Sequence, residues 1–359
     1  MVDATQVLQY VANGLSFGVI LALAAIGLSL VYGILGLSNF AHGDFLAFGA
    51  FMALFFGVAA FPGNDSLVLT AVVVGLVLVG AGLVDHFMTK RLTRAERWTA
   101  LGAGVALALY GAFLAISPGP AGTSDRVLVL ATLLGVVCTV GLTVGLEFAV
   151  WRPLRRKRAT LLTLVIVSVG LSFVVRNGLQ MYFGGDSKQF DRPQLVADSF
   201  FGILITPAQQ FTFVLALALI AGVHLFLRYT RTGKSMRAVA DNLDLARVSG
   251  IDVDRVVVYV WAIAGALVGV AGVLLALYNN NNLFVNMGFG IIIPLFASVI
   301  LGGIGSAYGA ALGGLVVGVA MKTSSLWLGA AGEYELAAAF LILAVMLLVR
   351  PQGLLGVKR

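Results

Sequence analysis

Residues 228–255 read RYTRTGKSMRAVADNLDLARVSGIDVDR and form the longest polar interruption in a chain whose mean hydropathy is +1.01. Six of these residues are basic, and the stretch lies between two long apolar segments. Loops rich in lysine and arginine are retained on the cytoplasmic side of a membrane. The interruption therefore predicts a cytoplasmic loop between two membrane-spanning helices.

The middle of this loop, residues 235–249, has the periodicity of an amphipathic helix. Its apolar residues share one face and its charged residues lie elsewhere: Met236, Val239, Ala240, Leu243 and Ala246 against Arg237, Asp241, Asp244 and Arg247. Such a helix either lies on lipid headgroups or docks against another protein. The pattern alone leaves both interpretations open.

The composition is that of a polytopic membrane protein. Hydrophobic residues make up 60% of the 359 residues, charged residues make up 11%, and there are 44 glycines, which suit close packing of membrane helices. The apolar segments are 6–33, 40–61, 67–86, 98–116, 127–150, 160–182, 209–227, 256–278, 288–303, 305–327 and 334–350. We expect a single transmembrane domain over 1–359, an all-α polytopic bundle of about 8 to 11 membrane segments. Whether an inverted repeat relates its two halves stays open.

The basic residues predict the orientation of the chain. Most lie in four clusters, at 90–97, 152–158, 228–255 and 350–359, which are separated by even numbers of apolar segments. All four clusters can therefore be cytoplasmic, together with the C-terminus. The other basic residues are expected in or near outside loops: Arg126, Arg176, Lys188, Arg192 and Lys322. Because no soluble face collects the net charge of +7, nucleic-acid binding is not indicated.

Two stretches break the helical pattern, NFAHGD at 39–44 and GGIGS at 302–306. Irregular backbone at membrane depth is tolerated only inside protein or beside a water-filled cavity, and paired interruptions often mark a transport pathway. The candidate pathway residues are Asn39, His42, Gly43, Asp44, Gly302, Gly303 and Gly305. The alternative is that both stretches are ordinary loops whose glycines serve helix packing.

No pattern for catalysis or metal binding is present. Gly233-Lys234-Ser235 imitates the end of a phosphate-binding loop, but Arg228 stands where that loop requires glycine. Glu147 is expected to pair with Arg152 or Arg155 at the membrane boundary, whereas Asp44 either lines a cavity or is structural. The lone Cys138 cannot form an internal disulfide. We expect no enzyme, no cofactor and no bound metal.

Five stretches carry a resemblance to a known family: GLSLVYGILGLSNFAHGDF (27–45), LEFAVWRPLRRKR (146–158), the loop at 228–256, LGGIGSAYGAALGGLVVG (301–318) and RPQGLLG (350–356). Together they make the chain similar to the permease subunits of high-affinity branched-chain amino-acid ABC importers. NFAHG and LGGIGS are the specific motifs among them. Related subunits serve other neutral amino acids, urea and short amides, so the resemblance leaves the solute open.

The resemblance implies a coupling segment that docks on a cytoplasmic ATPase. Its residues would be Arg237, Asp241, Asn242, Leu243, Asp244, Leu245 and Gly250. The usual glutamate-alanine-alanine is replaced here by Leu243, Asp244 and Leu245, whereas Gly250 is kept. The implied partners are two ATP-binding subunits, a homologous second permease, an external solute-binding protein and membrane lipid. The implied location is the cell (inner) membrane, with multiple crossings.

Two further expectations concern the rest of the chain. Residues 82–130 resemble an extra helical pair added to the compact family pattern. A different class of function, a stand-alone ion- or proton-coupled carrier or a channel, would use His42, Asp44 and Glu147 as a relay. The scarcity of intramembrane charges and the long amphipathic cytoplasmic segment argue against it. The N-terminus lies outside only if 40–61 crosses fully.

Overall fold

The computed structural model describes residues 4–59, 125–190, 197–200, 202–328, 334–350 and 352–355. The longer helices are α1 (Ala4–Leu35), α2 (His42–Ala59), α5 (Asp125–Leu146), α7 (Leu161–Phe183), α8 (Pro207–Tyr229), α11 (Val253–Tyr278), α12 (Met287–Gly302), α13 (Ala307–Leu328) and α14 (Glu335–Val349). Shorter ones are the π-helix η2 (Glu147–Trp151), α6 (Arg152–Arg156), α9 (Arg231–Asp241) and α10 (Leu243–Val248). Two antiparallel pairs complete the described fold, β1 (Lys188–Gln189) with β4 (Asn282–Leu283) and β2 (Asp198–Phe200) with β3 (Ile203–Ile205).

The all-α transmembrane class is confirmed. Among the described residues, 6 helices are long and apolar enough to cross a membrane: α1, α5 continued through η2 and α6, α7, α8, α11 and α13. Helices α2, α12 and α14 are apolar but shorter. The expected segments 67–86 and 98–116 lie outside the described residues, as does the expected extra pair at 82–130 up to the start of α5.

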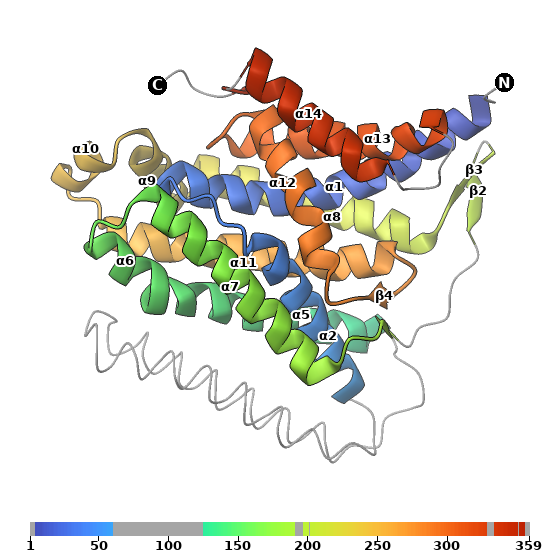
Figure 1. Cartoon of the computed structure of the whole chain (residues 1–359), viewed down its shortest axis with the longest axis horizontal. Helices are drawn as coiled ribbons and strands as arrows, with labels where there is room; N and C mark the ends of the chain where they lie inside the picture. Colours follow the sequence, from blue (N-terminus) through green and yellow to red (C-terminus); the bar gives the residue numbers. More distant parts are fainter. Residues whose placement is uncertain are drawn as a thin grey trace.

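The short helices and the β-hairpin lie at opposite ends of the long axis of the molecule (Figure 1). Helices α6, α9 and α10 and the C-terminus lie towards one end, whereas the N-terminus and the β2–β3 hairpin lie at the other. The basic clusters at 152–158 and 228–255 therefore share one end with the C-terminal tail, as their even spacing predicts. The cluster at 90–97 lies outside the described residues.

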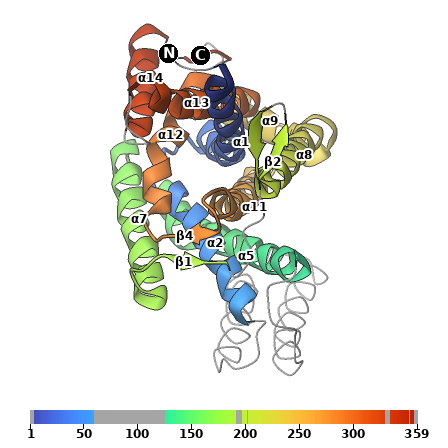
Figure 2. The ribbon, with the colours of Figure 1, turned by 90° about the vertical axis from the view of Figure 1, so that its right-hand side faces the viewer.

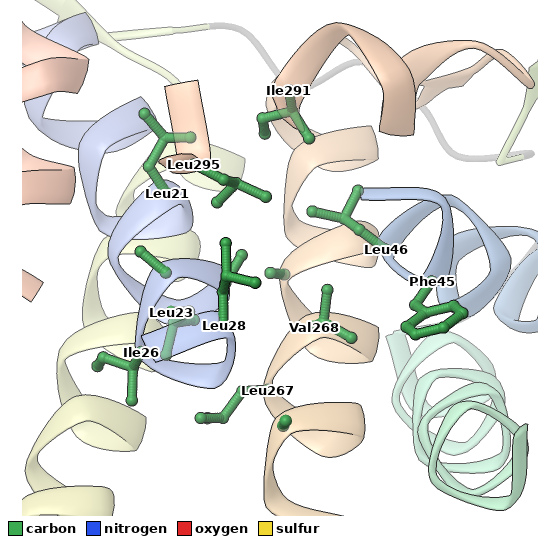
Figure 3. Packing of buried hydrophobic residues seen from close by; sticks show 14 of the residues in the cluster. Leu21, Leu23, Ile26, Leu28, Phe45, Leu46, Leu267, Val268, Ile291 and Leu295 are labelled. Carbon is green, nitrogen blue, oxygen red and sulfur yellow. The ribbon is translucent and has the colours of Figure 1, made fainter. Parts of the chain in front are cut away.

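Helices α1 and α11 occupy the middle of the bundle, and the other helices surround them (Figure 2). Apolar side chains from α1, α2, α11 and α12 meet in this core: Leu21, Leu23, Ile26, Leu28, Phe45, Leu46, Leu267, Val268, Ile291 and Leu295 (Figure 3). Glycines allow the backbones to approach closely, since a Cβ on Gly318 of α13 would lie 2.4 Å from the Cα of Gly18 in α1. Such contacts are how membrane helices pack without a hydrophobic driving force between them.

Candidate functional site

The break between α1 and α2 holds two buried polar side chains. Asn39 accepts the Ala41 N–H through Oδ1 at 3.1 Å, and His42 begins α2 with its Nε2 3.0 Å from the carbonyl oxygen of Ala24 in α1. Asn39 Nδ2 and His42 Nδ1 have no hydrogen-bond partner among the described residues. Buried polar atoms without partners are costly, so this turn has unmet hydrogen-bonding capacity.

The next residue, Gly43, brings the starts of two short helices into backbone contact. A Cβ on Gly43 would lie 2.1 Å from the carbonyl oxygen of Gly288, the second residue of α12, and a Cβ on Gly288 would lie 2.3 Å from that of Gly43. Any side chain at either position would force α2 and α12 apart. The glycine therefore fixes where the break lies relative to α12.

Asp44 forms a buried ion pair with Arg176 of α7. Arg176 Nε lies 3.1 Å from Asp44 Oδ1 and Nη2 lies 3.2 Å from Oδ2, while Ser172 donates a further hydrogen bond to Oδ2. Arg176 was expected in or near an outside loop, but it lies within α7 because Asp44 neutralises it there. In the sequence, Arg176 stands alone inside an apolar run, and an arginine in such a run is rare without a function or a partner.

The second interruption, at 302–306, is the turn of a helical hairpin. A Cβ on Gly302 would lie 1.9 Å from the carbonyl oxygen of Gly309, and Gly303 and Gly305 have positive φ angles of 110° and 83°. The tail closes the turn, since the Leu354 and Leu355 N–H groups donate to the Leu301 and Gly302 carbonyls at 2.8 and 2.9 Å.

The structure does not bring this turn together with His42. Gly305 lies against Gly33 of α1, whereas His42 lies against Ala24 and Gly27. Gly27 and Gly33 are about 9 Å apart along the helix axis at 1.5 Å per residue. The two interruptions therefore occupy different depths.

The segment expected to couple to an ATPase forms two helices rather than one. The single helix expected over 235–249 is interrupted at Asn242, whose φ of −156° and ψ of 105° end α9. Its side chain accepts the Leu245 N–H at 2.9 Å and so caps α10. The amphipathic face is otherwise confirmed, because Met236, Val239 and Ala246 are buried.

Helix α10 presents apolar side chains away from the bundle. Leu245 is 62% exposed and Val248 is 81% exposed, and the neighbouring charged residues Asp244 and Arg247 are also exposed. Gly250 follows with a φ of 84°, a left-handed conformation that favours glycine. The segment is thus a rigidly capped helix with an uncovered apolar surface.

Glu147, the first residue of η2, belongs to a separate hydrogen-bond network. It accepts hydrogen bonds from both Nη atoms of Arg155 and from Trp261 Nε1, the last at 2.8 Å. Of the two expected partners it is Arg155 that pairs, because Arg152 pairs with Asp254 at 2.5 Å. Among the described residues Asp44 and Glu147 share no hydrogen-bond partner, so no direct chain of contacts connects them as a relay.

The family model described as "Branched-chain amino acid transport system / permease component" matches residues 10–103 and 99–350. The chain belongs to this family. The high-affinity branched-chain amino acid transport system permease protein LivH of Escherichia coli K12 is 30% identical over 357 residues, which cover 97% of this chain and 95% of LivH. The corresponding permease BraD of Pseudomonas aeruginosa is 29% identical over 359 residues, with the same two coverages.

The permease family match includes both parts of the candidate site, namely the break before α2 and the segment α9–α10. LivH and BraD are transport permeases rather than enzymes. Among solved structures, PsaBC from Streptococcus pneumoniae in complex with Fab aligns over 96% of this chain and 92% of that chain, at 12% identity and a TM-score of 0.36. A likeness that weak carries no argument about this permease.

Proposed function

We propose that this permease forms part of a membrane pathway for branched-chain or other neutral amino acids and is driven by ATP hydrolysis on separate subunits. The observation that carries the proposal is the apolar surface of α10, where Leu245 and Val248 are 62% and 81% exposed. The surrounding loop is basic, and large apolar side chains there need a protein groove to leave water. A docking helix explains both the exposure and the two caps.

Each coupling residue then has a distinct part. Leu245 enters the groove on the ATPase, and Asn242 and Gly250 define the two ends of α10. Leu243 is half-buried and packs against the permease core. The exposed side chains of Arg237, Asp241 and Asp244 contact the polar rim of the same groove.

The proposal includes an assembly and an orientation in the membrane. The partners are two cytoplasmic ATP-binding subunits, a homologous second permease and an external solute-binding protein. The end of the molecule that holds α6, α9, α10 and the C-terminus faces the cytoplasm of a multi-pass protein in the cell (inner) membrane. Its three basic clusters support this side, because lysine and arginine are retained there.

The pathway passes the break before α2, at Asn39, His42, Gly43 and Asp44. Unpaired Asn39 Nδ2 and His42 Nδ1 support this position, since they can bind water or solute during transport. The other pathway residues, Gly302, Gly303 and Gly305, act from a distance by allowing the α12–α13 hairpin to move against α1.

Reconstitution tests the proposal against a stand-alone carrier. The chain is placed in liposomes alone, and separately with its second permease, ATPases and binding protein, and uptake of radiolabelled leucine is measured. We expect uptake only from the full assembly and only with ATP. Uptake by the chain alone, driven by a proton or sodium gradient, would refute the proposed function.

A further inference from the structure

The buried ion pair between Asp44 and Arg176 is more than helix packing requires. The two side chains are 2% and 11% exposed, and each lies inside an apolar helix. Desolvation offsets most of the attraction in such a pair, so apolar residues would hold α2 to α7 equally well. Ionisable residues inside membrane segments point to a function by default.

The Arg176 guanidinium keeps one edge unpaired. Of its five N–H donors, Nε donates to Asp44, and Nη2 donates to Asp44 and to Ser172 Oγ, the last at 3.0 Å. Its Nη1 has no hydrogen-bond partner among the described residues. Asp44 and Ser172 therefore fix the plane of the guanidinium and leave two N–H groups for a ligand.

Two phenylalanine rings frame this guanidinium. The Arg176 Cζ lies 4.4 Å from the ring centroid of Phe289 in α12 and 5.4 Å from that of Phe173 in α7. The two residues are 58% and 54% exposed, so the frame lies at the surface of the bundle. An apolar group lying on these rings would be next to the free N–H groups.

The break before α2 contacts the same two helices that carry Phe173 and Phe289. Phe40 lies in the break before α2; its N–H donates to Ser168 of α7 at 3.1 Å, and its ring is 4.8 Å from that of Phe296 in α12. The break therefore contacts both α7 and α12. Non-helical backbone does not persist against lipid. Asn39, Ala41 and His42 are buried, so the rest of the chain already covers this backbone.

We propose that Arg176 binds the carboxylate of the transported amino acid through Nη1, between Phe173 and Phe289, with Asp44 and Ser172 as positioning residues. The inference rests on the proposed function, because it takes the α7–α12 surface as a wall of the pathway. A carboxylate accepts charge-assisted hydrogen bonds from a guanidinium, and a branched apolar side chain fits against the two rings. Asp44 already balances the arginine charge, which keeps the solute bound weakly enough to leave.

A charge swap separates recognition from packing. The full complex is prepared with D44R/R176D and with R176Q, and leucine binding is measured in nanodiscs without the binding protein, with ATP-driven uptake measured in liposomes. The matched control is K322E/E335K, since Lys322 and Glu335 form another partly buried pair, 2.7 Å apart and 19% exposed on both sides. Leucinamide, which lacks the carboxylate, is tested as a competitor on the wild-type complex.

We expect D44R/R176D to assemble normally, because it keeps an ion pair between α2 and α7. Its leucine binding and uptake should fall about 10-fold or more, the effect of losing hydrogen bonds to a charged group. R176Q should lose as much, and the control swap should retain wild-type affinity. Leucinamide should fail to displace leucine.

Wild-type leucine uptake by the swap variant would overturn the inference and leave the pair as a packing contact. Competition by leucinamide equal to that of leucine would overturn it as well, even if the swap variant did not assemble. Either result leaves the proposed function intact. A wild-type complex that takes up no branched-chain or other neutral amino acid with ATP refutes the proposed function first, and this inference with it.

Discussion

Replacing Leu245 and Val248 together by serine should weaken ATPase docking without harming the fold. Burying one such side chain fully is worth ~2 kcal/mol, and the exposed fractions of 62% and 81% leave about 1.2 and 1.6 kcal/mol for a partner to gain. The sum of about 3 kcal/mol corresponds to roughly 100-fold in affinity. The free permease loses little, because both side chains already face away from its core.

Two measurements check this prediction. The affinity of the purified ATP-binding subunits for the permease pair in nanodiscs should fall by about two orders of magnitude. Solute-stimulated ATP hydrolysis should be lost at subunit concentrations that saturate the wild type, and should return in part when the ATPases are in large excess. Thermal unfolding of the permease alone should not change.

The matched control is the double substitution of Leu354 and Leu355 by serine. These residues are 46% and 49% exposed and lie in the C-terminal tail, towards the same end of the molecule as α10. Their backbone hydrogen bonds to α12 do not depend on the side chains. Equal loss of ATPase affinity in the control, or unchanged affinity in the α10 variant, would refute the assignment of α10 as the docking element.

Three further substitutions test how the site is held. Gly233→Ala would place a Cβ 2.4 Å from the α8 backbone, so the connection between α8 and α9 must shift. Solute-stimulated ATP hydrolysis should therefore fall. The control Gly222→Ala, whose Cβ would meet nothing within 4 Å, should leave that activity unchanged. Gly43→Ala would place a Cβ 2.1 Å from the α12 backbone and should destabilise the chain by about 1–3 kcal/mol in a thermal unfolding assay. Glu147→Gln leaves the Arg155 charge without its partner; because Arg155 is 26% exposed, we expect a loss of about 1–3 kcal/mol, seen as a lower unfolding temperature.

The periodicity of the sequence predicted which residues of the 235–249 segment are buried. The 3.6-residue repeat placed Met236, Val239 and Ala246 on the buried face, because that repeat depends only on helix geometry. The break at Asn242 was missed, although asparagine is a preferred N-cap and the Leu245 N–H is three residues on. Periodicity continues across such a break with little change in phase, so it does not reveal two helices.

Contacts between distant residues could not be read from one sequence. Arg176 and Asp44 are 132 residues apart, and nothing in either segment specifies the other. An arginine alone in an apolar run predicts a partner or a function but not its identity. In the same way, Gly43 and Gly288 read as ordinary glycines until the structure places the start of α2 against the start of α12.

Helix α11 follows α10 closely in the chain and packs against α2. Only residues 249–252 separate it from α10, and Asp252 caps it by accepting the Arg255 N–H at 3.2 Å. Further along, a Cβ on Gly272 would lie 2.0 Å from the carbonyl oxygen of Leu46 in α2. Because packed interfaces shift as units rather than deforming continuously, displacement of α10 should move α11 and α2 together. The motion would therefore reach His42 and Asp44 through the backbone of α2, and the proposed pathway would open by movement of a helix start.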